Sequence, residues 1–295
     1  MAVDTPDGCE TSEEYHGECA TKEIEPTPRR QAGTGARNAV GSTKPPLRLG
    51  RPPLSSEPRS GTRQRRRDPL VSSEQPMSRL HCMAAGLSQV ADHFKAEMPA
   101  PIELPSETTE GALGLVIFEN HGRRLMRAVT WGFQRLTRDM RERGEEPGRI
   151  GLVADLTNPK WDQMAADPRY RCLIVMTHFA NPDGVPGERV RTWFSLKREP
   201  IMVWAGFCRN IPDQGPLYAG MTMDANEAIQ PTNDRMPVLL DPHEYEPWLH
   251  GSIRDVIGFQ FRPPFAAERF RVEQTEDLWR SGKGPPSASS QLALI

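Results

Sequence analysis

The apolar pattern of this chain begins near residue 77, and the residues before it show neither helical nor strand periodicity. From residue 87 to 98, apolar side chains recur at helical spacing, which predicts one amphipathic helix. Pro99 and Pro101 follow and are expected to end it. Residues 1–76 are rich in Pro, Arg, Ser, Gly and Glu and cannot bury enough surface to offset the entropy of ordering, so we expect a disordered arm.

Short apolar or alternating runs predict strands along the rest of the chain. Residues 113–120 and 124–133 are expected to form two strands joined by a turn at Asn120-His121-Gly122. Further runs with strand character lie at 172–179, 189–196, 200–207, 216–223, 236–240 and 270–275. The first three of these further runs are expected to form an antiparallel meander.

Helical signals are sparse outside residues 87–98. The charged stretch 134–150 is expected to hold a helix fragment and a surface loop. Asp241 precedes Pro242 and stands three residues before Glu244, a capping arrangement that predicts a short helix. Pro247 is expected to keep that helix short.

Many short strands with few helices imply an α+β fold. We expect a mostly antiparallel sheet that curls into a barrel-like form, with a few helices outside it. The folded domain is predicted to span residues 77–280. A Gly-, Pro- and Ser-rich flexible tail is predicted at 281–295.

Charge is unevenly placed along the chain. The formal net charge of -2 gives no global field that would recruit nucleic acid. Residues 29–67, however, carry eleven Lys or Arg and one acid, Glu57. Such an arm could hold a phosphate backbone. We favour two plainer interpretations, a solvated tail or an upstream stretch included by a mis-assigned start site.

The cysteines and the apolar runs indicate a compartment. Five cysteines are scattered without C-x-x-C spacing, and the first twenty residues do not resemble a signal peptide. No apolar run approaches the ~20 residues that span a bilayer. We therefore expect a cytoplasmic monomer with reduced thiols. The histidines show no paired ligand spacing, so neither a metal nor a cofactor is expected.

Two stretches resemble a known family. They are MTMDANEAIQPTNDRMPVLLDPHEYEPW, from Met221 to Trp248, and YRCLIVMTHFANPDG, from Tyr170 to Gly184. Together they resemble the SRAP family, the SOS response-associated peptidases that process abasic sites in single-stranded DNA. The resemblance covers about Met77 to Trp279 and implies a barrel-like SRAP fold. It also implies a DNA partner and three reactive side chains.

The first of these side chains is the family's nucleophile, a cysteine directly after the initiator methionine. Its α-amine and thiol close a ring on the aldehyde of the abasic sugar. The sequence MSRLHCMAAGLSQVADHF aligns with that start, so Ser78 takes the cysteine's place after Met77. In a chain begun at Met77, the Ser78 amine could still form a Schiff base, but a hydroxyl is a far weaker nucleophile than a thiolate. Cys82 lies four residues on, and we interpret it as a packed thiol rather than a replacement.

The other two reactive side chains are also changed. Where the family has a glutamate after its Arg-Cys-Leu-Ile strand, this chain has Asn181, and we favour a turn former before Pro182 over a polar contact to ligand. Where the family has the histidine of His-Asp-Arg-Met-Pro, this chain has Asn233. Carboxamides cannot exchange protons near neutral pH. Asp234 and Arg235 are expected to form an ion pair at the start of the next strand.

The resemblance assigns DNA contacts as well. Arg79, Trp131 and Asn226 stand at candidate DNA-binding positions. Trp131 could stack on a base or pack in the core, and Asn226 could cap or bridge the loop around the site. The family's Asn-Ala-Arg run falls near Leu152–Asp155, where Asp155 replaces an arginine and would repel phosphate.

The resemblance therefore implies an abasic-site processing protein of the DNA damage response. The substitutions predict that its crosslinking and autopeptidase chemistry is impaired or lost. One alternative is a non-catalytic module that binds single-stranded DNA or another protein. The other is a weak enzyme that uses Ser78 as its N-terminal nucleophile.

Overall fold

The computed structural model describes residues 80–286. Every described residue belongs to one unit of the chain, residues 70–295. The predicted arm at 1–76 and the last nine residues lie outside the described part.

The strands are β1 (Leu80–Cys82), β2 (Leu113–Asn120), β3 (Arg123–Trp131), β4 (Phe133–Arg135), β5 (Gly148–Ile150), β6 (Leu152–Val153), β7 (Arg171–Met176), β8 (His178–Asp183), β9 (Val190–Leu196), β10 (Met202–Ile211), β11 (Gly215–Asp224), β12 (Arg235–Pro237), β13 (Leu239–Leu240) and β14 (Phe270–Leu278). The α-helices are α1 (Leu87–Phe94), α2 (Arg138–Glu142), α3 (Asp162–Ala166), α4 (Tyr245–His250) and α5 (Ile253–Phe261), and the short 3₁₀ helices are η1 (Pro159–Trp161), η2 (Pro168–Tyr170), η3 (Pro242–Glu244) and η4 (Ala267–Arg269).

A closed ring of strands forms the centre of the domain. Its order is β11, β3, β2, β7 and β10, and β10 pairs back with β11 to close it. Among the pairings of the ring, only β3 with β11 is parallel. The edges are extended by β12 and β6 on β11 and by β13 on β10. The prediction of a mostly antiparallel, barrel-like sheet with few helices is confirmed.

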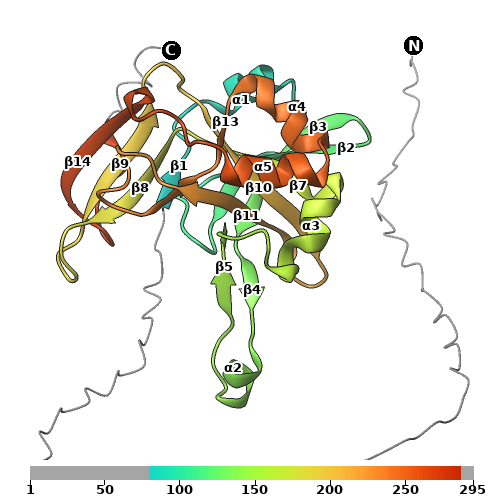
Figure 1. Ribbon diagram of the computed structural model, residues 1–295, viewed down its shortest axis with the longest axis horizontal. Helices are drawn as coiled ribbons and strands as arrows, with labels where there is room; N and C mark the ends of the chain where they lie inside the picture. The colour runs from blue at the N-terminus through green and yellow to red at the C-terminus, as the bar shows by residue number, and fades with distance from the viewer. Residues whose placement is uncertain (1–79, 287–295) are drawn as a thin grey trace, which may run out of the picture. The chain divides into compact units, whose positions relative to one another are not determined.

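A second sheet lies beside the ring, in the order β1, β8, β9, β14 (Figure 1). The predicted meander is wrong at its second step: β9 pairs antiparallel with β8, as expected, but its other neighbour is β14 and not β10. The apolar run 172–179 is also two strands rather than one. The chain leaves the ring at Thr177, whose backbone N–H and hydroxyl both donate to the Cys82 carbonyl. Apolar content alone did not reveal that crossing between sheets.

Local backbone chemistry sets several element ends. The β2–β3 turn has positive φ at both His121 and Gly122, which matches the twist of a tight hairpin. Helix α1 ends at Phe94, before the predicted residue 98, because Lys95 adopts a left-handed conformation. Glu97 then hydrogen-bonds along β3 instead of continuing the helix.

The helices after β13 differ from the prediction in two ways. The capping box of Asp241 and Glu244 is present, as predicted. Pro247 does not stop the helix, since it is the third residue of α4, where a missing N–H costs little. Helix α5 was not predicted, although Ser252 and Asp255 form a second capping box at its start.

Two further segments differ from expectation. The helix fragment expected in residues 134–150 is present as α2, but it lies at the tip of an unpredicted hairpin of β4 and β5 that extends away from the sheets (Figure 1). Arg191 donates to the carbonyls of Trp279 and Lys283, so the first residues of the predicted flexible tail are held against β9. No helix of the described chain has the length and apolarity to cross a membrane.

The inside of the ring is packed by aromatic rings against glycines. A Cβ at Gly220 would lie 2.0 Å from the Trp204 ring, and a Cβ at Gly114 would lie 2.1 Å from the Tyr218 hydroxyl. The hydroxyl of Tyr218 is in turn 2.9 Å from Nε2 of His81, which is buried on β1. These contacts join the second sheet to the ring through its interior.

Candidate functional site

The site predicted from the sequence lies where the described chain begins. Ser78 and Arg79 are outside the described residues. Leu80, the first residue of β1, pairs with Ala180 of β8, and Asn181 is the next residue of β8. Asn181 therefore lies beside the N-terminal end of β1.

Asn181 makes a polar contact and is not a turn former. It lies within β8, paired with Thr192, and its side chain is 2% exposed. Its Nδ2 donates to the Thr232 hydroxyl at 3.1 Å, and that hydroxyl donates onward to the Ile229 carbonyl at 2.9 Å. The favoured turn-former interpretation is wrong because β8 continues through Asp183.

Asn233 follows Thr232, so the fold brings the two substituted positions together. Its Oδ1 accepts from the Arg235 backbone N–H at 2.9 Å, a local turn that shapes the loop before β12. Both carboxamides are thus engaged in neutral hydrogen bonds. Neither can gain or lose a proton near neutral pH.

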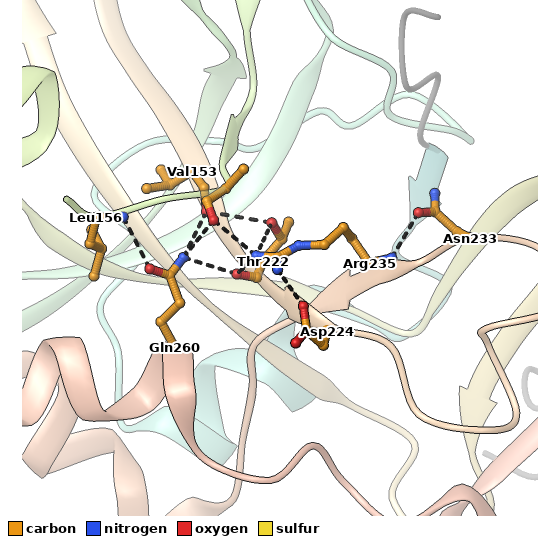
Figure 2. Close-up of polar contacts among 8 residues, drawn as sticks. Val153, Leu156, Thr222, Asp224, Asn233, Arg235 and Gln260 are labelled. Atoms are coloured by element: carbon orange, nitrogen blue, oxygen red, sulfur yellow. Dashed lines mark hydrogen bonds and ion pairs between the residues drawn. The ribbon is translucent and has the colours of Figure 1, made fainter. Parts of the chain in front are cut away.

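Both terminal nitrogens of the Arg235 side chain are engaged by groups from two segments, β11 and the residues after β6, while its Nε is buried without a partner among the described residues. Nη1 pairs with Asp224 at 2.7 Å, and Nη2 donates to the carbonyls of Ala154 and Thr222 (Figure 2). The predicted ion pair with Asp234 is wrong, since the partner lies across the β11–β12 pair. The arrangement holds the 152–155 segment against β11 and leaves little of the guanidinium for a phosphate.

Gln260 is the structural centre of this region, and the sequence reasoning missed it. It comes from α5 and is 5% exposed. Its Oε1 accepts from the Leu156 N–H, and its Nε2 donates to the carbonyls of Val153, Ala154 and Thr222 (Figure 2). The capping box at Ser252 was the available sequence signal for its helix.

A pocket of about 470 Å³ opens beside Arg235. Its lining residues are Ala154, Asp155, Thr157, Met223, Asp224, Arg235, Gln260, Phe261, Arg262 and Pro264. Hydrogen bonds from Thr157, with a smaller contribution from the Arg235 charge, hold the pKa of Asp155 below its usual value. Asp155 and Asp224 therefore place two carboxylates at the mouth of this pocket, which disfavours a phosphate there.

Two of the candidate DNA contacts are buried. Trp131 is 1% exposed, stacks on Tyr218 and donates from Nε1 to the Gly151 carbonyl, which favours core packing over base stacking. Asn226 is 8% exposed, donates to the Phe265 carbonyl and accepts from the Ala228 and Ile229 N–H groups. Asn226 therefore both caps the loop that follows it and bridges to Phe265, which are the two structural roles predicted for it.

Three titratable side chains of β1 and β8, those of His81, Cys82 and His178, are unsuited to chemistry near pH 7. Burial raises the pKa of the Cys82 thiol to about 12, so it does not supply a thiolate. Burial lowers the pKa of His178 to about 4 and that of His81 to about 3, so both rings stay neutral. His178 is fully buried and hydrogen-bonds to Thr177. None of these three replaces the lost nucleophile or the lost proton carriers.

The fold and this site define a class: a closed barrel with a second sheet beside it, and a polar site between β8 of that sheet and the loop before β12. The chain belongs to the SOS response associated peptidase (SRAP) family, whose sequence profile matches residues 78–274, about two thirds of the chain. The family membership confirms the resemblance and supports a peptidase-like, DNA-related role in the SOS response. No curated protein matches the chain.

Solved structures support the fold independently. A protein from Bordetella bronchiseptica matches with a TM-score of 0.56 and 19% identity, covering 67% of this chain and 99% of its own. A protein from Bacteroides thetaiotaomicron matches with a TM-score of 0.54 and 17% identity, covering 66% and 90%. A phage-related protein from Bordetella bronchiseptica matches with a TM-score of 0.52 and 14% identity, covering 67% and 93%. At these identities the likeness concerns the fold alone.

Proposed function

We propose that this chain is an SRAP protein that engages abasic sites in single-stranded DNA during the DNA damage response without forming a durable crosslink. One observation carries the proposal: Asn181 and Asn233, at the family's acid/base positions, lie on either side of Thr232 in neutral hydrogen bonds. A ring-opened sugar bound there would meet carboxamides at both positions where the family has its proton carriers. The protein acts in the cytoplasm as a monomer, as its sequence predicts.

The loss of durable trapping follows from the side chains. Ser78 offers an alcohol where the family has a thiol, and an oxygen-containing ring opens more readily than a thiazolidine. A Schiff base formed by a free Ser78 amine would therefore hydrolyse. Cys82 does not rescue the step, because burial keeps its thiol protonated.

The test uses an oligonucleotide with one abasic site, incubated with the full chain and with a chain begun at Met77, then resolved on a denaturing gel. We expect no heat-stable band from either. The triple variant Ser78→Cys, Asn181→Glu, Asn233→His, begun at Met77, is the matched control and is expected to give one. A heat-stable band from the unaltered chain would refute the proposal.

A second candidate function is a protein-interaction module without catalysis. Two observations favour it. Asp224 occupies the Arg235 guanidinium, which weakens phosphate binding. Helix α5 also exposes Ile253, Ile257 and Phe261, four residues apart, by 45%, 41% and 68%. If single-stranded DNA fails to bind even at low salt, this candidate replaces the first.

A further inference from the structure

Three metal-ligating side chains converge outside the site described above. Glu119, next to the end of β2, faces Glu246 and His250 of α4. One ligand atom from each lies within 4.8 Å of the others. His250 Nε2 is 2.8 Å from Glu119 Oε2 and 3.4 Å from Glu246 Oε2. Glu246 and His250 are four residues apart, so they project from one face of the helix.

The second carboxylate oxygen of each glutamate, Oε1, contacts an arginine. Arg124 of β3 contacts Glu119 Oε1 at 3.0 Å and also pairs with Glu246 Oε1. The guanidinium therefore takes Oε1 of both glutamates, and His250 meets Oε2 of both. Groups that bind the second oxygen of a ligating carboxylate fix its orientation. Arg124 thus orients the two carboxylates through their Oε1 atoms, and both Oε2 atoms face His250 Nε2.

The elements that carry the three ligands, α4 and β2, are also fixed in place by the same sheet. Between Glu246 and His250, Trp248 is fully buried and its Nε1 donates to the Cys172 carbonyl of β7 at 2.9 Å. Glu119 lies on the neighbouring strand β2, with 19% of its side chain exposed. His250 is the last residue of α4, where the helix dipole favours a positive charge.

We propose that Glu119, Glu246 and His250 bind a divalent transition-metal ion of the Zn²⁺ class, with water completing its coordination. Zn–N and Zn–O distances of about 2.0–2.2 Å place neighbouring ligand atoms of a tetrahedral site roughly 3.3 Å apart. The separations of 2.8 and 3.4 Å bracket that spacing. His250 is half-exposed, which leaves a side open for water. Histidine spacing alone had predicted no metal, because two of the three ligands are glutamates.

A metal ion bound here would connect α4 to the hairpin of β2 and β3. Its role is therefore structural or regulatory, because none of these ligands contacts Asn181 or Asn233. A ligand that binds only the folded state raises the melting temperature with its free concentration. The ion is expected to stabilise the docking of α4, and the Arg124 network makes the same connection more weakly without it.

The test is a titration of the full chain with Zn²⁺ by isothermal calorimetry, after treatment with a chelator. The chain has other thiols and histidines, so the readout is the difference between variants. We expect His250→Asn and Glu119→Gln each to lose one equivalent, or to weaken it at least about tenfold. His243→Asn, on the exposed turn before α4, is the matched control and is expected to bind like the unaltered chain.

Two further readouts make the result decisive. Bound Co²⁺ should give a visible absorption band that His250→Asn removes, and Zn²⁺ should raise the melting temperature of the unaltered chain more than that of the variant. Melting in chelator shows whether each variant folds. Equal Zn²⁺ stoichiometry and affinity in all four proteins would overturn the proposal and leave a salt-bridge network. The experiment contains no DNA, so its outcome is independent of the proposed function.

Discussion

Two buried regions of this domain are held together by different physics. Inside the ring, Trp204 and Tyr218 fill space that Gly220 and Gly114 leave open, so shape decides which residues fit. Beside the ring, a polar seam is made by the side chains of Gln260 and Arg235, which bind backbone carbonyls of the 153–156 and 222–224 segments. In this polar seam, the matching of hydrogen-bond donors to acceptors decides which residues fit.

The contrast shows why reactive groups can change while the fold persists. Asn181 and Asn233 lie on segments that the seam and the second sheet position, and neither residue fills the ring. Replacing a proton carrier there with a carboxamide leaves the aromatic packing untouched. Fold and chemistry are therefore separable in this protein, and each region should respond to its own kind of perturbation.

The largest expected effect comes from acid, which should act on buried rings. Burial lowers the pKa of His81 to about 3 and that of His178 to about 4, from 6.5. The unfolded chain therefore binds more protons below pH 6.5, and stability is lost as pH falls from 6.5 toward these values. Each ring contributes about 1.4 kcal/mol per pH unit, so the free energy of unfolding should fall by on the order of 5 kcal/mol between pH 6.5 and 4.5.

Urea unfolding followed by tryptophan fluorescence at several pH values measures that slope. His81→Gln keeps a hydrogen-bonding group near Tyr218 but cannot titrate, so its slope should be about half that of the unaltered chain. An identical slope in the variant would show that the ring interior does not exclude the proton.

The next largest effect should come from filling the ring interior. In Gly220→Ala, the new Cβ meets two Trp204 ring atoms at 2.0 and 2.1 Å, and that ring is 1% exposed. We expect a loss of about 3 kcal/mol in the free energy of unfolding. Gly258→Ala is the control: it lies in α5 with nothing within 4 Å, and it should gain up to about 1 kcal/mol. If both changes had the same sign, shape would not be the deciding factor.

Much of this fold could be predicted from sequence because most strands carry their own periodicity. The runs at 113–120, 189–196 and 216–223 coincide closely with β2, β9 and β11. The ring's closure and the crossing at Thr177 could not, since both depend on pairing between distant segments. The 134–150 hairpin was obscured because its strands are three residues each.

The candidate site was predicted only in part. Motif alignment identified Asn181 and Asn233, and the structure brings these two positions together. It could not reveal that Asp224, rather than Asp234, pairs with Arg235, because side chains on adjacent strands meet across a register that the sequence does not state. Gln260 was missed for the same reason: its partners lie more than thirty residues away along the chain.

The polar seam should be sensitive to lost hydrogen bonds at nearly constant shape. Gln260→Met keeps the side-chain length but leaves the buried Leu156 N–H without its acceptor. The carbonyls of Ala154 and Thr222 keep their Arg235 donor, so the expected loss is about 2 kcal/mol rather than more. Phe261→Gln, on the next and exposed residue, should stay within about 0.5 kcal/mol. Chemical denaturation compares them, and equal losses would show that the seam adds no specific stability.

The smallest expected loss of stability comes from Asp224→Asn, which should also change the affinity for single-stranded DNA. Asp224 is 93% exposed where it pairs with Arg235, so Asp224→Asn should cost less than about 1 kcal/mol. The change removes one carboxylate and frees Nη1 of the Arg235 guanidinium beside the pocket, so affinity for single-stranded DNA should rise. The slope of log affinity against log salt should steepen by about 0.7.

Asp213→Asn makes the same charge change at the other end of β11, in a turn that suits asparagine, and controls for net charge. Fluorescence anisotropy at several salt concentrations measures both variants. If Asp213→Asn raised affinity as much as Asp224→Asn, long-range charge would explain the gain and the Arg235 pocket would have no part in contacting DNA.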